Sequence, residues 1–305
     1  MSLYRQVPVI QLAVIALVSL MSCRSNDAFV VVPAQESKGI LLISASIKGD
    51  DSYGAFVDTG VDPSVVDISV ARALGLPIDE SSSREAEGSG DGQGLRVMRA
   101  TIEGLSLNGQ DFEAIESVAA DLSSFGSALN FDLGLILGYS FLRNRIIRFN
   151  YPAGEIVIAD SQSSLPPATT PVSNAHRIPL RFNSDEDMIP VFEIGVGGEA
   201  VIVSLDTGKS GGVEFFGSAV DRLELIQVAD AGAREMRHGA RGGRTVSVGI
   251  LDAISVGPFA VENAKVSFSE KLPASEAREG NAGNAFLSNF VVTVDYINGE
   301  IIFEQ

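Results

Sequence analysis

The sequence is poor in the residues on which several common chemistries depend. Its 305 residues include one cysteine, two histidines and no tryptophan. A single cysteine excludes a disulfide bond within the chain, and two histidines are too few for a typical histidine-rich zinc site. A Ser-His-Asp triad would have to use His176 or His238, and neither lies in a motif that suggests one. Basic residues are also scarce. With 22 Lys and Arg against 39 Asp and Glu, the net charge is −17, which argues against nucleic-acid binding.

Glycine and short apolar runs, in contrast, are abundant. The chain has 31 glycines, and 45% of its residues are hydrophobic. Many Val- and Ile-rich runs end at Gly, Asn, Asp or Pro, which is typical of β-strands joined by tight turns. The sequence therefore predicts a mainly β protein, long enough for one large domain or two medium ones.

The amino terminus has the pattern of a secretion signal. Arg5 provides a positive charge, and the apolar run that begins at Val9 is short for a membrane-spanning helix. The run ends in Leu20-Met21-Ser22-Cys23, which is similar to a bacterial lipobox, where the cysteine is lipidated after cleavage. We therefore expect a signal peptide at 1–22 and a protein that Cys23 anchors to a membrane of the bacterial cell envelope, on its periplasmic or extracellular face. The alternative is an ordinary cleaved signal with an incidental cysteine.

An internal repeat is the main feature of the chain. Val57-Asp58-Thr59-Gly60 matches Leu205-Asp206-Thr207-Gly208, each after an apolar run. At nearly constant spacing downstream, Gly138-Tyr139-Ser140-Phe141-Leu142 matches Gly283-Asn284-Ala285-Phe286-Leu287, and each is followed by the pattern of a β-hairpin. One Asp-Thr-Gly motif can be a chance surface turn. Two at matching points of a duplication indicate a shared role.

The repeat also sets the expected domain boundaries. Residues 160–176 have the composition of a linker, with prolines and small polar residues that have nothing to bury. We predict a first lobe at 40–159 and a second lobe at 177–305, preceded by a polar tether at 23–39. The spacing of apolar residues predicts one short helix in each lobe, at 69–76 and 218–225.

These motifs resemble the retropepsin-like aspartic proteases of the pepsin clan, in particular the bacterial form with two tandem lobes in one chain. The resemblance rests on the strands that end in Asp-Thr-Gly, on Ile136-Leu137-Gly138 before a helical Phe-Leu, and on the terminal hairpin at 292–299. It implies a mainly β, bilobal acid-protease fold of two duplicated β-barrel lobes with short helices. It also implies a monomeric aspartic endopeptidase that acts on peptides or proteins, needs no metal or other cofactor, and takes one catalytic aspartate from each lobe, Asp58 and Asp206.

Two adjacent carboxyl groups can hydrolyse an amide bond without a covalent intermediate. Like charges in contact do not both ionise cheaply, so the pair holds one proton. The ionised carboxylate takes a proton from water, while the protonated carboxyl hydrogen-bonds the scissile carbonyl. Gly60 and Gly208 would let backbone N–H groups approach these carboxylates.

The resemblance also assigns supporting roles. It implies that Thr59 and Thr207 hydrogen-bond across the lobe interface, and that Asp62 binds the substrate backbone, with Ser210 as its counterpart in the second lobe. From the residues alone, Asp62 is equally consistent with a turn residue before a proline. Glycine-rich stretches at 88–94 and 239–244 stand where the family has flaps that close over a peptide.

Two positions depart from the family pattern. Val61 and Lys209 stand where a small residue usually follows Asp-Thr-Gly. An ammonium beside the dyad would favour the doubly ionised pair and impair proton sharing, unless Lys209 points to solvent. These departures leave open a catalytically degenerate, peptide-binding envelope lipoprotein with the same fold. A third possibility is that the two Asp-Thr-Gly loops face apart.

Overall fold

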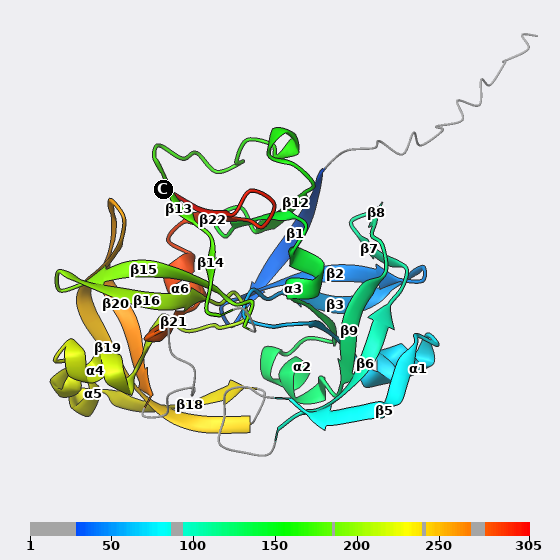
Figure 1. Cartoon of the computed structure of the whole chain (residues 1–305), viewed down its shortest axis with the longest axis horizontal. Coiled ribbons are helices and arrows are strands. Elements are labelled where there is room, and N and C mark those ends of the chain that lie inside the picture. Colours follow the sequence, from blue (N-terminus) through cyan, green and yellow to red (C-terminus); the bar gives the residue numbers. More distant parts are fainter. Residues whose placement is uncertain (1–28, 87–93, 185–186, 240–241, 270–277) are drawn as a thin grey trace, which may run out of the picture.

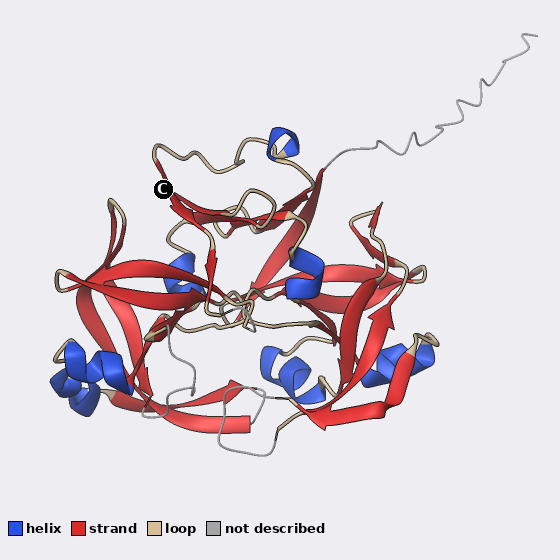
Figure 2. Cartoon of the chain, viewed as in Figure 1, coloured by secondary structure: helices blue, strands red, loops and turns tan. Residues whose placement is uncertain are grey.

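The computed structural model describes residues 29–86, 94–184, 187–239, 242–269 and 278–305. Within them the chain is mainly β, with two large sheets and short helices (Figures 1 and 2), which confirms the mainly β prediction. The predicted signal peptide, Cys23 and most of the predicted flap at 88–94 lie outside the described residues. No helix in the described part of the chain is both long and apolar enough to cross a membrane.

The first sheet has fifteen strands. They are β1 (Phe29–Ser37), β2 (Ile40–Ile47), β3 (Asp50–Val57), β4 (Ser64–Asp67), β5 (Ile78–Glu85), β6 (Arg96–Ile102), β7 (Leu105–Leu107), β8 (Gln110–Asp111), β9 (Ile115–Ala120), β10 (Leu133–Leu137), β11 (Ile146–Asn150), β12 (Glu155–Ala159), β13 (Ala175–Pro179), β22 (Val291–Asp295) and β23 (Glu300–Glu304). Their order is β13-β23-β22-β11-β12-β1-β2-β3-β10-β4-β9-β6-β5, with β7 on β2 and β8 on β7.

The second sheet has eight strands, all from the second half of the chain. They are β14 (Arg181–Phe182), β15 (Pro190–Val196), β16 (Glu199–Leu205), β17 (Val213–Phe216), β18 (Ala233–Gly239), β19 (Gly242–Val256), β20 (Phe259–Ser269) and β21 (Gly280–Ala282), in the order β14-β15-β16-β21-β17-β20-β19-β18. Figure 1 shows this sheet on one side of the molecule and strands β2 to β10 on the other. We call residues 29–159 the first half and residues 175–305 the second half.

The helices are short. They are α1 (Ile68–Ala73), α2 (Ser123–Leu129), α3 (Tyr139–Leu142), α4 (Gly217–Arg222), α5 (Ile226–Ala231) and α6 (Asn284–Leu287), with one 3-10 turn, η1 (Gln162–Ser164). Helices α1 and α4 confirm the two helices predicted from apolar spacing. Asp67 caps α1, because its carboxylate accepts hydrogen bonds from the backbone N–H groups of Ser69 and Val70.

The two strands that lead to the Asp-Thr-Gly motifs are anchored in the apolar core. On β3, Ala55 is fully buried and Val57 is 2% exposed, while Val203 and Leu205 on β16 are fully buried. Branched and aliphatic side chains of this kind fit a sheet that is covered on its faces. Burial of these residues fixes the position at which each strand ends, and therefore the position of the aspartate that follows.

The polar tether predicted for 23–39 is wrong from Phe29 onward. Residues 29–37 form β1, which pairs with β12 at one end and β2 at the other. Val30 and Val32 alternate inward and are 9% and 1% exposed. The three consecutive valines after Phe29 supply β-branched residues that gain more from burial in a sheet than from solvation as a tether.

The terminal hairpins of the two halves join in the first sheet. Hairpins β11–β12 and β22–β23 confirm the hairpin pattern predicted from the sequence, and β11 pairs antiparallel with β22. At the centre of that pairing Arg148 lies opposite Thr293, and Arg148 Nε donates a hydrogen bond to Thr293 Oγ1 at 3.2 Å. Arg148 and Thr293 occupy corresponding positions in their hairpins, so the pairing is nearly two-fold symmetric.

Candidate active site

The two Asp-Thr-Gly loops are built in the same way. Asp58 follows β3, and its backbone N–H donates to Leu137 O on the parallel neighbour β10 at 2.9 Å. Asp206 follows β16, and its N–H donates to Ala282 O on the parallel neighbour β21 at 3.0 Å. Each aspartate therefore leaves its strand at a point fixed by a second, adjacent strand.

The threonines of the two loops bind each other. Thr59 N–H donates to Thr207 Oγ1 and Thr207 N–H donates to Thr59 Oγ1, both at 3.1 Å. The hydroxyls also donate across the interface, from Thr59 to Leu205 O at 2.6 Å and from Thr207 to Val57 O at 2.8 Å. Both threonines are buried, at 1% and 3% exposure. This reciprocal network holds the two loops face to face.

The glycines of the loops lie against the opposite carboxylates. Gly60 N–H donates to Asp58 Oδ1 at 2.7 Å, and Gly208 N–H donates to Asp206 Oδ1 at 3.1 Å. A Cβ atom on Gly60 would lie 2.7 Å from Asp206 Oδ1, and one on Gly208 would lie 2.1 Å from Asp58 Oδ2. Only glycine permits this approach. The two carboxyl groups therefore share one site, which excludes the arrangement in which the loops face apart.

Burial makes the two carboxyl groups weaker acids than ordinary carboxyl groups. Burial, and then the negative charge of Asp206, raise the pKa of Asp58 to about 7, against the opposing N–H groups of Gly60 and Gly208. Burial also raises the pKa of Asp206, but Lys209, Arg278 and the amide of Asn281 lower it again in part. The pair therefore retains a proton at a pH where ordinary carboxyl groups have lost theirs.

The surroundings of the two aspartates differ. Asn281 Nδ2 donates to Asp206 Oδ2 at 2.9 Å. On β17 and β21 Glu214 lies opposite Asn281, whereas the corresponding positions on β4 and β10 are Val65 and Ile136. Both of these belong to an apolar cluster of the first half. Asp58 thus has an apolar neighbourhood where Asp206 has a polar one.

Lys209 points neither to bulk solvent nor at the dyad. Its Nζ donates to Glu214 Oε2 at 2.7 Å, and its side chain is 15% exposed. Glu214 is 1% exposed and also pairs with Arg244 at 2.6 Å. Burial raises the pKa of Glu214, but Lys209 and Arg244 outweigh it and leave the pKa below its usual value. Glu214 therefore stays ionised and compensates the cation that the sequence places next to Asp-Thr-Gly.

Asn284 of the second half and Tyr151 of the first half link the Asp206 loop to a terminal hairpin. Asn284 Nδ2 donates to Thr207 O at 2.8 Å, and Tyr151 OH donates to Asn284 Oδ1 at 2.7 Å. Burial, and then Asp206, raise the pKa of Tyr151, so its hydroxyl remains a donor. Tyr151 comes from the hairpin of the first half, and this link therefore crosses between the halves.

Among the described residues, the other predicted site residues are not hydrogen-bonded to the two carboxyl groups. Asp62 is exposed and makes no side-chain hydrogen bond within the described ranges. Ser210 is half-buried, and its carbonyl oxygen lies against the turn at Gly39, where an added Cβ would be 3.0 Å away. Of the predicted flap at 239–244, the described residues close the antiparallel hairpin of β18 and β19, where Gly239 pairs with Gly242.

The sequence motifs do not identify Asn281, Glu214 or Tyr151 as residues of the site. The signal for two of them is a difference between the two copies of the repeat. Asn281 and Glu214 stand where the first half has aliphatic residues. Tyr151 lies in the turn between β11 and β12. Its contact with Asn284 depends on the pairing of β11 with β22, which no spacing in the sequence reveals.

The threonine network yields a prediction about stability. Thr207→Val removes the acceptor of Thr59 N–H and the donor to Val57 O in a buried setting. We expect the free energy of unfolding to fall by about 2 to 4 kcal/mol, since each buried group left unpaired costs about 1 to 3 kcal/mol. Urea unfolding measures this loss. Thr207→Ser keeps the hydroxyl and should lose clearly less. Equal losses for both variants would show that the methyl group, not the network, provides the stability.

Comparison with known proteins agrees with this geometry. A family model described as aspartyl protease matches residues 43–141, a region that contains Asp58, Thr59 and Gly60 and ends at Phe141. Asp206 lies outside the matched region. A separate search of curated proteins found no match to the chain. The family match supports an aspartic-protease-like function for the chain.

Proposed function

We propose that the chain is an aspartic endopeptidase in which two duplicated lobes each contribute one catalytic aspartate, Asp58 and Asp206. One observation carries the proposal. Each carboxylate lies against the glycine of the opposite Asp-Thr-Gly loop, inside a reciprocal Thr59–Thr207 network. Such an interlocked pair of carboxyl groups can hold one shared proton and one water. The family match to the region around Asp58 is consistent with it.

The unequal surroundings of the dyad assign the two roles. An amide donor and two cations, Asn281, Lys209 and Arg278, favour the ionised form of Asp206. In the described part of the chain Asp58 has no amide or cationic partner of this kind, and it therefore keeps the proton. Asp206 therefore removes a proton from water as the oxygen attacks the scissile carbonyl carbon. Asp58 gives its proton to the carbonyl oxygen, which yields a neutral tetrahedral diol. The C–N bond then breaks as the amine nitrogen takes the proton held by Asp206, and a diol hydroxyl returns its proton to Asp58.

The ion pair of Lys209 bears on the alternative, a degenerate peptide-binding protein. That alternative depends on an ammonium that is free to act on the two aspartates. Because Glu214 holds the ammonium and stays ionised, its negative charge offsets part of the positive charge near Asp206. Lys209 then biases the shared proton toward Asp58 without forcing both carboxyl groups to ionise.

The test of the function is hydrolysis itself. The purified protein is incubated with a diverse peptide pool from pH 3 to 8 in water enriched in 18O. We expect cleavage with one 18O atom in each new carboxylate, and inhibition by a statine-type peptide, whose hydroxyl mimics the tetrahedral diol. Binding of that peptide without any cleavage across the range would overturn the enzyme proposal in favour of the binding protein.

The role of Asn281 is tested by giving it the residue of the first half. Asn281→Ile removes the hydrogen bond to Asp206 and should raise the lower apparent pKa in the profile of kcat/KM against pH by about one unit, equal to roughly 1.4 kcal/mol. Ile136→Val, at the equivalent position beside Asp58, is the matched control and should leave the profile in place. A uniform loss of activity without a shifted profile would mean that Asn281 has only a structural role.

We also propose that the protein is lipid-anchored in the bacterial cell envelope through Cys23, because this cysteine ends the apolar run as in a lipobox. In a bacterial host, a clickable fatty acid should label the parent and not Cys23→Ser, and only the parent should sediment with membranes. Labelling of both proteins, or of neither, would contradict the anchor and leave an ordinary secretion signal.

A further inference from the structure

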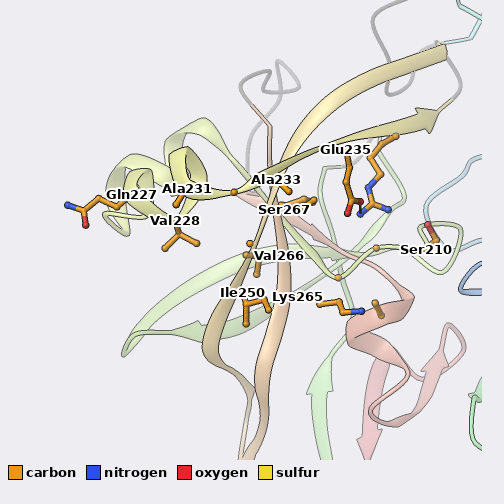
Figure 3. Close-up of a pocket in the computed structure, with 17 residues that line it drawn as sticks. Ser210, Gln227, Val228, Ala231, Ala233, Glu235, Ile250, Lys265, Val266 and Ser267 are labelled. Carbon is orange, nitrogen blue, oxygen red and sulfur yellow. Dashed lines mark ion pairs between the residues drawn. The ribbon is translucent and has the colours of Figure 1, made fainter.

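A cavity of about 890 Å³ opens beside the Asp206 loop in the second half (Figure 3). Its lining begins at Ser210, two residues after Gly208, and continues along α5 and the hairpin β18–β19 to Lys265 on β20. Ala285 of α6, whose backbone N–H donates to Gly211 O at 3.0 Å, also lines it. A volume of this size lies in the range of ligand-binding pockets, and it exceeds the space taken by one amino-acid side chain.

One wall of the cavity is apolar. It includes Val248 and Ile250 of β19, which lie on the same face of the β19–β20 ladder as Lys265 because Ile250 pairs with Lys265. Ile250 is 62% exposed, one of the few large hydrophobic side chains left so accessible in the described ranges. A single exposed isoleucine needs no explanation, but one that extends an apolar wall inside a cavity offers area for a ligand to bury.

The cavity is also cationic, in a chain with a net charge of −17. Arg237 is paired with Glu235 on the same strand at 2.7 Å. Lys265 is exposed, and among the described residues its side chain has no hydrogen bond or ion pair. Lys209 and Arg237 flank Gly211, where an added Cβ would lie 3.9 Å from Lys209 Nζ and 4.0 Å from Arg237 Cζ. Because Lys209 and Arg237 are each paired with a glutamate, Lys265 supplies the uncompensated positive charge that favours an anion here.

The first half has no such charge at the equivalent place. The residues that correspond to Lys209 and Glu214 are Val61 and Val65, which pack with the apolar cluster of that half. Any preference for acidic residues should therefore appear on one side of the scissile bond only.

We propose that this cavity binds the part of a peptide substrate that runs from the scissile bond over the second half, and that Lys265 selects an aspartate or glutamate there. The inference rests on the proposed peptidase function and names its substrate class: peptides with an acidic residue on one side of the cleaved bond, accompanied by an aliphatic residue that packs on Val248 and Ile250. Lys265 acts as a specificity-determining residue, outside the catalytic pair.

The test uses an octapeptide library in which Glu, Gln or Lys is fixed at each position in turn. The parent, Lys265→Gln, Lys265→Glu and the control Lys48→Gln, an exposed lysine of the first half, are compared in kcat/KM and in equilibrium binding. The parent should favour Glu over Lys at one position by about fivefold, as expected of an ion pair near solvent. Lys265→Gln should abolish that preference, Lys265→Glu should reverse it, and Lys48→Gln should keep it.

The outcomes separate the two proposals. Cleavage by the parent with the same Glu-to-Lys ratio in all four proteins would overturn the role of Lys265 and leave the peptidase intact. Silence of all four proteins in cleavage would sink the peptidase. In that case binding still decides the cavity, because Lys265→Glu should weaken the Glu-containing peptides and not the Gln-containing ones.

Discussion

Asp58→Asn and Asp206→Asn should each reduce peptide cleavage by about a thousandfold or more, the scale set by loss of a positioned acid or base. Asparagine keeps the size of the side chain and cannot exchange a proton. Because the two carboxyl groups act as one unit, the double variant should be about as inactive as either single one. The measurement is kcat/KM on a peptide taken from the cleaved pool, at the pH optimum of the parent.

The same variants carry a stability signature that separates them from damaged proteins. The pKa of Asp58 is raised from 3.8 to about 7 in the folded chain. Between these values the folded state holds a proton that the unfolded chain has lost, so stability falls as pH rises through this window. The loss is on the order of 4 kcal/mol by pH 8, at roughly 1.4 kcal/mol per pKa unit. Asp58→Asn removes this pH-dependent loss of stability.

We therefore expect urea unfolding to show Asp58→Asn near the parent at pH 4 and more stable than the parent at pH 8. An inactive variant with this profile has lost chemistry and kept its fold. If Asp58→Asn were less stable than the parent at both pH values, its inactivity would reflect a disrupted structure of the Asp-Thr-Gly loop. If either single variant kept near-parental activity, the shared dyad would be wrong.

The features that sequence could predict are those that the two halves share. Matching Asp-Thr-Gly motifs indicated where the loops lie, and matching apolar patterns indicated α1, α4 and the terminal hairpins. Each of these depends on local periodicity or turn chemistry, which a short window of sequence contains. The same reliance on the repeat misplaced β1. The predicted first lobe begins at residue 40, after β1. The partner of β1 is β12, at the far end of the first half, so no nearby segment of sequence indicates the pairing.

The features that sequence could not predict are contacts between strands far apart in the chain. The sequence permits two orientations for Lys209, because its partner Glu214 faces it only through the geometry of the loop before β17. Asn281 reaches Asp206 because β21 runs parallel to β16. Register between non-neighbouring strands decides both contacts, and register follows from packing over the whole sheet rather than from any motif.

The buried network around Glu214 gives the second large prediction. Glu214→Val should lower the free energy of unfolding by about 3 to 5 kcal/mol, because removing one member of a buried ion cluster leaves the other charges unpaired. Lys209 and Arg244 would lose their common partner at 15% and 18% exposure. Urea unfolding at neutral pH measures the loss. Activity should fall as well, since an uncompensated ammonium favours ionisation of both aspartates.

Lys209→Val combined with Glu214→Val separates charge from volume. These are the residues found at the equivalent positions of the first half, Val61 and Val65, where an apolar floor beside the aspartate is tolerated. The double variant should recover most of the stability lost by Glu214→Val, since Arg244 keeps its hydrogen bond to Ser269 Oγ at 2.6 Å. Together with the single variant Lys209→Val, these proteins complete a double-mutant cycle that gives the coupling energy of the Lys209–Glu214 pair. Strictly additive losses would instead assign the damage to the smaller side chain at 214. The balance of charge beside Asp206 would then contribute little to the fold, and Lys209 would again be a cation free to disturb the shared proton.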